Sequence, residues 1–349
     1  MAQAPSVQIE ASETTPPESA PPQHRLEASL NLQRKAALAS GSATDHAGRV
    51  QVMPMAGFDM NRTIFGNLEG TLARMVMHDK VAKEAFWSDA AVHDIETAYA
   101  ASEQAQPTPA VDKRLIDFMV DECDFSMEHA DGSFLQHLVF CHDYSAKYFP
   151  EHSANVALLH SILGTATNTF AMTVDKLPQL RALLTDFEAL QVEAFPSLLR
   201  LFYDGGLMPE LTANLHRLDK LDSVRFHRVI DNEPMELDAE NLWINLNFHL
   251  MHFVDFMPTA NWASHMDDPL LVQFQALSVF LDKANQRRAQ VTVTFPESAQ
   301  PPVGEAKTLV GRLSKAIPIS VKKSLAQKSI RQYSQKIGHS LDYELKWKS

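Results

Sequence analysis

The segment 155–164 constrains the fold most, because it is almost wholly apolar and too short to cross a membrane. A helix without a polar side must be covered by other elements all around it. The same segment carries His160, and a desolvated imidazole needs a hydrogen-bond partner or a ligand. The sequence therefore predicts a helical core with a polar pocket at His160.

The composition is typical of a protein with a large buried core and no disulfide framework. The chain has 349 residues, of which 45% are hydrophobic. Cys123 and Cys141 are its only cysteines, and we expect both to be small core residues in a reducing compartment. No signal peptide is evident, and no window approaches the ~18 apolar residues of a spanning helix. We expect a soluble cytoplasmic protein.

Apolar residues at helical spacing predict an all-α chain in four parts. Residues 1–55, rich in Pro and Ser at their start, are expected to form a disordered arm. Residues 56–106 should form a small helical preface that ends at the segment Gln104–Pro109. Residues 107–290 should form the main helical domain, and residues 291–349 a basic helical tail.

Several individual elements follow from the same patterns. Asn61 is expected to cap a helix that reaches Val76, and a second helix is expected around Ala82–Trp87. Pro196 should kink or restart the helix that contains it. The alternating segment Gln290–Phe295 is the one convincing strand candidate.

Histidines on inward faces are the candidate metal ligands. His137 shares a helical face with Phe134 and Cys141, so it should point into the core. His160 is buried because its helix has no polar side, and His129 should lie on a loop over the same region. His129, His137 and His160 are therefore candidates for one metal site, since neutral imidazole is a common metal ligand. Alternatively, each is a hydrogen-bonded core histidine.

Two further residues are candidates for proton transfer. His249 shares a face with Leu242 and Leu246, so it too should face inward. His252 and Asp255 lie one turn apart and are interpreted as a surface pair, with a position in the pocket as the alternative for His252. Glu193 is a candidate general acid or base, or a partner of a metal ligand. The alternative for Glu193 is a solvated charged face.

The segments His129–Leu138 and His160–Thr165 resemble an uncharacterised HD-like family of all-helical domains. In metal-dependent HD proteins, a first His joins a His-Asp pair and a later Asp at the metal. The resemblance implies that His137 is the first His and His160 the second. Ser161 stands where the family has Asp, which removes a hard oxygen ligand. A two-metal site is therefore not expected, whereas one metal with His129 as substitute ligand is compatible with the sequence.

Two functions are compatible with these residues. In the first, one divalent metal (Fe, Mn or Zn) held by the histidines serves a hydrolase or an oxygenase that acts on an unknown small molecule. In the second, the chain is a non-catalytic binding or scaffolding module with a degraded HD-type site. Metal analysis distinguishes the two.

The tail has a charge opposite to that of the rest of the chain. Residues 305–349 carry ten Lys or Arg and three Asp or Glu, a balance of +7 within a total of −12. Val310, Leu313 and Val321 lie at helical spacing, and Pro318 should divide the tail into two helices. The tail could pack on the acidic body, or bind an anionic membrane or an acidic partner as a peripheral protein. Nucleic acid is not expected, because no nucleic-acid-binding motif occurs.

Overall fold

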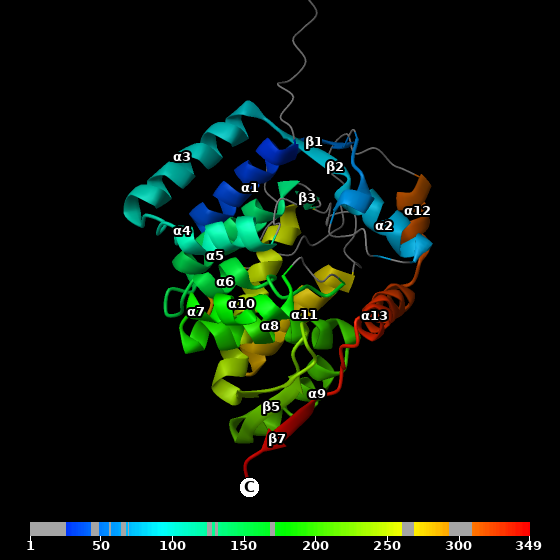
Figure 1. Cartoon of the computed structure of the whole chain (residues 1–349). Coiled ribbons are helices and arrows are strands. Elements are labelled where there is room, and N and C mark those ends of the chain that lie inside the picture. The colour runs from blue at the N-terminus through cyan, green and yellow to red at the C-terminus, as the bar shows by residue number, and fades with distance from the viewer. Residues whose placement is uncertain are drawn as a thin grey trace, which may run out of the picture.

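The structure is a computed structural model of the whole chain. It describes residues 26–42, 49–55, 57–63, 68, 70–123, 128–129, 132–167, 172–259, 269–292 and 309–349. This part of the chain is predominantly helical with few strands, which confirms the all-α class (Figure 1). In the described part, no helix combines the length and the apolar character needed to cross a membrane.

Helix α10 (Ala239–Thr259) lies at the centre of the core. It contacts the helices and the strand that surround it, namely α1 (Leu26–Ser40), α5 (Phe134–Tyr148), α6 (Asn155–Leu159), α8 (Asp186–Asp204), α11 (Pro269–Lys283) and β5 (Leu221–His227). Leu242, Leu246, Leu250 and Val254 along it are all completely buried. A helix that is apolar around most of its circumference needs such enclosure.

Capping explains where the central helices begin. Thr185 and Glu188 form a reciprocal capping box at the start of α8. Asp238 accepts a hydrogen bond from the Asn241 backbone amide at 2.7 Å, so it caps α10. The expectation of a restart at Pro196 is wrong, because α8 continues through this residue to Asp204.

The N-terminal region differs from the expected disordered arm. Residues 26–40 form α1, which packs against α3 (Asp89–Ala105) and α10. Strand β1 (Arg49–Pro54) pairs antiparallel with β2 (Lys83–Trp87), so the helix expected around Ala82–Trp87 is a strand. The expected arm is therefore wrong for these residues, while residues 1–25 lie outside the described part.

The helical preface also begins later than expected. A short 3-10 turn, η1 (Met60–Arg62), follows Asp59, and helix α2 (Thr71–Val81) starts ten residues after Asn61. The segment 104–109 does end α3, as its glutamine and proline residues predict. The remaining small elements connect the larger ones: α4 (Lys113–Asp117), the π-helix η3 (Phe118–Glu122), the hairpin β3 (Glu128–His129) with β4 (Gly132–Ser133), η4 (Val174–Lys176), α7 (Leu177–Ala182), α9 (Leu207–Ala213) and η5 (Leu215–Lys220).

A three-stranded antiparallel sheet lies at one end of the molecule, where β5 pairs with β6 (Pro234–Asp238) and with β7 (Glu344–Trp347) (Figure 1). The sequence patterns do not predict these strands. Thr292, in the segment expected to form a strand, makes only an isolated bridge to Ser42, and residues 293–295 lie outside the described part.

The C-terminal tail forms two helices, α12 (Leu309–Ala316) and α13 (Ile319–Lys336), separated at Pro318 as predicted. Ile330 and Tyr333 on α13 are buried against the body. Helix α13 contacts α8 and α11, and β7 completes the sheet with β5. The second half of the tail is therefore part of the folded body.

Candidate metal centre

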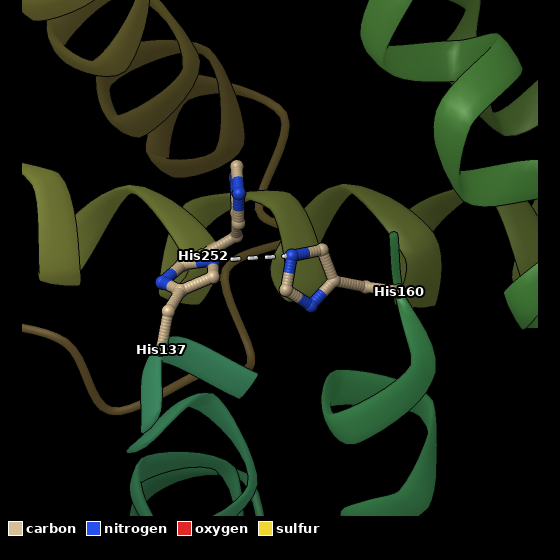
Figure 2. Close-up of side chains that lie close together, drawn as sticks. All are labelled: His137, His160 and His252. Atoms are coloured by element: carbon tan, nitrogen blue, oxygen red, sulfur yellow. Dashed lines mark hydrogen bonds between the residues drawn. The ribbon is translucent and has the colours of Figure 1, made fainter. Parts of the chain in front are cut away.

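Three buried histidines converge in the core. His137, His160 and His252 each offer one ring nitrogen, and these three atoms lie within 4.8 Å of one another. Their side chains are only 1%, 1% and 7% exposed. Figure 2 shows the rings meeting from three separate segments of the chain. Three buried His with this spacing could hold a metal ion.

Each histidine comes from a different helix. His137 lies in the first turn of α5, where its ring stacks on Phe134. His160 is the residue that ends α6, and His252 lies on the central helix α10. The contacts of α10 with both α5 and α6 bring the three residues together. The fold therefore brings together residues that are far apart in the sequence, since His137 and His252 are separated by 115 positions.

The two rings of His137 and His160 face each other through their Nε2 atoms, which lie 3.3 Å apart (Figure 2). Two nitrogens that bind one metal ion lie roughly 3–3.5 Å apart, because each ligand bond is about 2.1 Å long. The observed distance fits this requirement.

The opposite nitrogen of each of these rings has an acceptor. His137 Nδ1 lies 2.7 Å from Asp255 Oδ2, and His160 Nδ1 lies 2.6 Å from the Ala157 carbonyl oxygen. Carboxylate and carbonyl oxygens only accept hydrogen bonds, so we assign the proton of each neutral ring to Nδ1. Both Nε2 atoms, which lie 3.3 Å apart, then carry lone pairs.

Asp255 is itself held by a guanidinium from the N-terminal helix. Arg34 on α1 donates from Nε and Nη2 to the two carboxylate oxygens, both at 2.8 Å. Burial alone would raise the pKa of the Asp255 carboxyl, but the charge and hydrogen bonds of Arg34 and the hydrogen bond from His137 hold it well below its usual range. Asp255 therefore stays ionised and fixes the orientation of the His137 ring.

Aromatic side chains enclose the histidines. The Phe195 ring lies 4.9 Å from that of His160, and the Phe256 ring lies 5.0 Å from that of His252 and 5.1 Å from that of His137, all between ring centroids. Cys141 Sγ lies 3.9 Å from both ring nitrogens of His137. Burial raises the pKa of this thiol well above its ordinary value, so Cys141 is a neutral neighbour of the site.

The other two histidines that the sequence proposed for the site, His129 and His249, are not among the three that converge in the described structure. The backbone of His129 belongs to β3, next to the start of α5, and its side chain lies outside the described part. His249 is completely buried, but its ring stacks on Phe195 at 3.8 Å and does not belong to the converging group. Burial lowers the pKa of His249 to about 3. Within the described structure neither of its ring nitrogens has a hydrogen-bond partner.

Glu193 lies in an ion-pair network and outside the histidine group. Its carboxylate accepts from Arg181 Nε at 2.5 Å and also pairs with Arg228. Glu193 and Phe195 are two positions apart on α8, about 200° around the helix, so Glu193 faces away from the ring that touches His160. Glu193 is buried between two arginines, so the alternative of a solvated charged face is wrong.

Two residues near the site were assigned elsewhere from the sequence, and one was overlooked. The expected surface pairing of His252 with Asp255 is wrong, because both side chains are buried and both contact His137. The overlooked residue, Arg34, lies in the segment expected to be disordered. A pattern in the sequence of α10 could have indicated that His252 and Asp255 are buried. Polar residues recur at helical spacing on one face of this otherwise apolar helix, at Asn241, Asn245, His249, His252 and Asp255.

His142 bonds to its neighbour Asp143 at 2.9 Å and is not part of the converging group. Cys123 and Cys141 are both free and buried, as expected for small core residues.

Comparison with known proteins gives no relative. No family model matches the chain, and no curated protein or solved structure is significantly similar to it.

Proposed function

We propose that the protein is a mononuclear metal-dependent enzyme in which His137, His160 and His252 hold one divalent transition-metal ion. One observation carries this proposal: two Nε2 atoms lie 3.3 Å apart while the opposite nitrogen of each ring is committed to an acceptor oxygen. Ligating histidines characteristically donate their other ring N–H to a carboxylate or a backbone carbonyl. His137 and His160 have one partner of each kind.

A proton is the competing occupant of the same point. If one ring were an imidazolium, its Nε2–H could donate to the other Nε2. In either case the added positive charge lies in a buried site where Arg34 already pairs with Asp255. Metal analysis separates the two cases, because only the first requires a stoichiometric metal.

The three histidine ligands limit which metal ion the site would prefer. Three neutral imidazoles suit zinc or ferrous iron better than manganese, which prefers oxygen ligands. Three protein ligands leave a fourth position for water or substrate, as in catalytic zinc sites. Zinc would supply Lewis acidity and a bound water acidified toward neutral pH, the chemistry of a hydrolase, whereas iron would supply oxygen chemistry. We favour the hydrolase, acting on a small molecule.

The relation to HD-type domains is part of this proposal. Its support is that His137 and His160, the two positions matched by the resemblance, converge, and that a later carboxylate, Asp255, lies beside them. Ser161 is buried and replaces the family's Asp, so this chain would hold one metal through a third histidine, His252.

A non-catalytic module is the alternative, and the deep burial of the three imidazoles favours it. A cobalt-substituted protein distinguishes the two functions, since the visible spectrum of Co²⁺ reports its coordination. We expect azide to change the spectrum of the wild-type protein, because an enzyme needs an open coordination position. A cobalt spectrum that azide leaves unchanged would identify a closed site and support the binding or scaffolding module.

A further inference from the structure

Exposed apolar side chains gather at one corner of the molecule. In the described part of the chain, ten large hydrophobic residues are exposed, and six of them lie on α2, α12 and the first turn of α13. Helix α12 packs against α2, and α13 follows α12 directly in the chain, so these residues lie on neighbouring elements (Figure 1). We call this set the apolar corner: Leu72, Met75, Leu309, Leu313, Ile319 and Val321.

The exposure at this corner exceeds that of isolated surface hydrophobics. Leu309 is 72% and Leu313 59% exposed, and they lie one turn apart on α12. Single exposed apolar residues are normal on soluble proteins, whereas contiguous groups usually mark a surface that binds something. The other four exposed hydrophobics are scattered over β1, η3, η4 and α11.

Basic residues accompany the apolar corner. Residues 309–336, which form α12 and α13, contain seven Lys or Arg and no Asp or Glu. Arg312, Lys323 and Lys328 among them are exposed. The rest of the chain outside residues 305–349 has a balance of −19, the total of −12 minus the local +7. The corner is therefore a positive region on an acidic protein.

The far end of α13 is already used for packing. Ile330 and Tyr333 are buried, the Arg200 guanidinium lies 5.3 Å from the Tyr333 ring centroid, and Arg331 pairs with Asp204. The body thus covers Ile330 and Tyr333 near the end of α13 and leaves Leu309, Leu313, Ile319 and Val321 exposed. The sequence left open whether the tail packs on the body or binds an anionic surface or partner. Packing on the body explains the second half of the tail only.

We propose that the apolar corner docks on an anionic lipid surface. Leucine, isoleucine and valine side chains would enter the boundary between headgroups and acyl chains, while Arg312, Lys323 and Lys328 would contact lipid phosphates. The acidic remainder would be repelled by the same surface, so the protein would bind in one orientation, with α12 toward the lipid. This inference does not depend on a metal being bound in the core.

Sedimentation with vesicles tests this inference on the full chain. We expect binding to phosphatidylcholine vesicles that contain phosphatidylserine at low salt, weaker binding at high salt, and little binding to phosphatidylcholine alone. The double variant Leu309→Asp/Leu313→Asp and the double variant Lys323→Glu/Lys328→Glu should each bind more than about tenfold more weakly. Val279→Asp, at a residue 48% exposed on α11, is the matched control and should bind like the wild type.

Three results would overturn the inference. The first is no binding of the folded wild-type protein to anionic vesicles at low salt. The second is equal loss of binding in the Val279→Asp control. The third is a wild-type dimer that the Leu309→Asp/Leu313→Asp variant dissociates in analytical ultracentrifugation, which would assign the corner to a second copy. Circular dichroism and thermal unfolding of every variant verify that loss of binding is not loss of fold.

Discussion

His137 Nδ1 lies 2.7 Å from Asp255 Oδ2, and this contact connects the histidine group to Arg34 on the first helix of the fold. The Asp255 carboxylate accepts hydrogen bonds from both His137 and Arg34. It therefore orients the His137 ring, whose Nε2 lies near His160, and it also neutralises the buried Arg34 guanidinium. The site therefore depends on α1, even though α1 supplies none of the three histidines.

Replacing Asp255 by Asn should weaken metal binding about 10–100-fold, because the neutral amide leaves one acceptor oxygen for both His137 and Arg34 and removes the charge that holds the His137 ring. The variant should also lose about 3–5 kcal/mol of unfolding free energy, since Arg34 would be left buried without its carboxylate. Calorimetric metal titration and denaturant unfolding measure the two effects. Asp143→Asn, which affects only the His142 pair, is the control. Unchanged metal affinity in the folded Asp255→Asn protein would contradict the role of this contact.

Replacing Glu193 by Gln should destabilise the protein by about 3 kcal/mol, because Arg228 and Arg181 would lose a buried carboxylate partner. Metal content should stay at the wild-type level, since Glu193 faces away from the histidines. Elemental analysis and denaturant unfolding of the same preparation give both values. If metal were lost while stability stayed the same, Glu193 would belong to the site after all.

Replacing His249 by Phe should reduce the dependence of stability on pH between about 6.5 and 4.5, and His339, whose pKa burial lowers to about 4, should keep part of it. Burial lowers the pKa of His249 to about 3, whereas the unfolded chain binds a proton near pH 6.5. The wild type therefore keeps the full contribution of the neutral ring above pH 6.5 and loses about 2–3 kcal/mol by pH 4.5. The depressed pKa of Asp255 affects stability only below its unfolded value of about 3.9, outside this window.

Denaturant unfolding at several pH values measures this slope. A variant that retains the wild-type slope would show that His249 is not the group responsible. Metal content should be unchanged, because His249 is not one of the three converging histidines.

The sequence could predict that His137 and His160 are buried, because His137 shares a face with apolar residues and the helix of His160 has no polar side. On α10 the same argument turned His249 inward and put His252 at the surface, although both are buried. Helix α10 is enclosed on nearly every side, so its sequence has no solvent-exposed face. The orientation of His249 and His252 can therefore not be judged relative to such a face. The polar repeat along α10 carries that information, but it contains both histidines.

Elements that depend on distant partners were the ones the sequence did not predict. The segment Lys83–Trp87 contains good helix formers, yet it forms a strand because β1 pairs with it. Strand β5 likewise depends on β7, which lies more than a hundred residues further along the chain. Arg34 was overlooked for a related reason. Helix α1, which carries it, is stabilised by packing on α3 and α10, and its own sequence shows little apolar periodicity.

Metal content of the purified protein tests the central claim most directly. We expect about one zinc or iron per chain by elemental analysis, removal by a chelator, and stoichiometric reloading. His160→Ala and His252→Ala should each lose the metal, while His249→Phe, a buried control on the same helix as His252, should retain it. A wild-type protein that takes up no transition metal when reloaded, or single variants that bind as tightly as the wild type, would contradict the proposed metal centre.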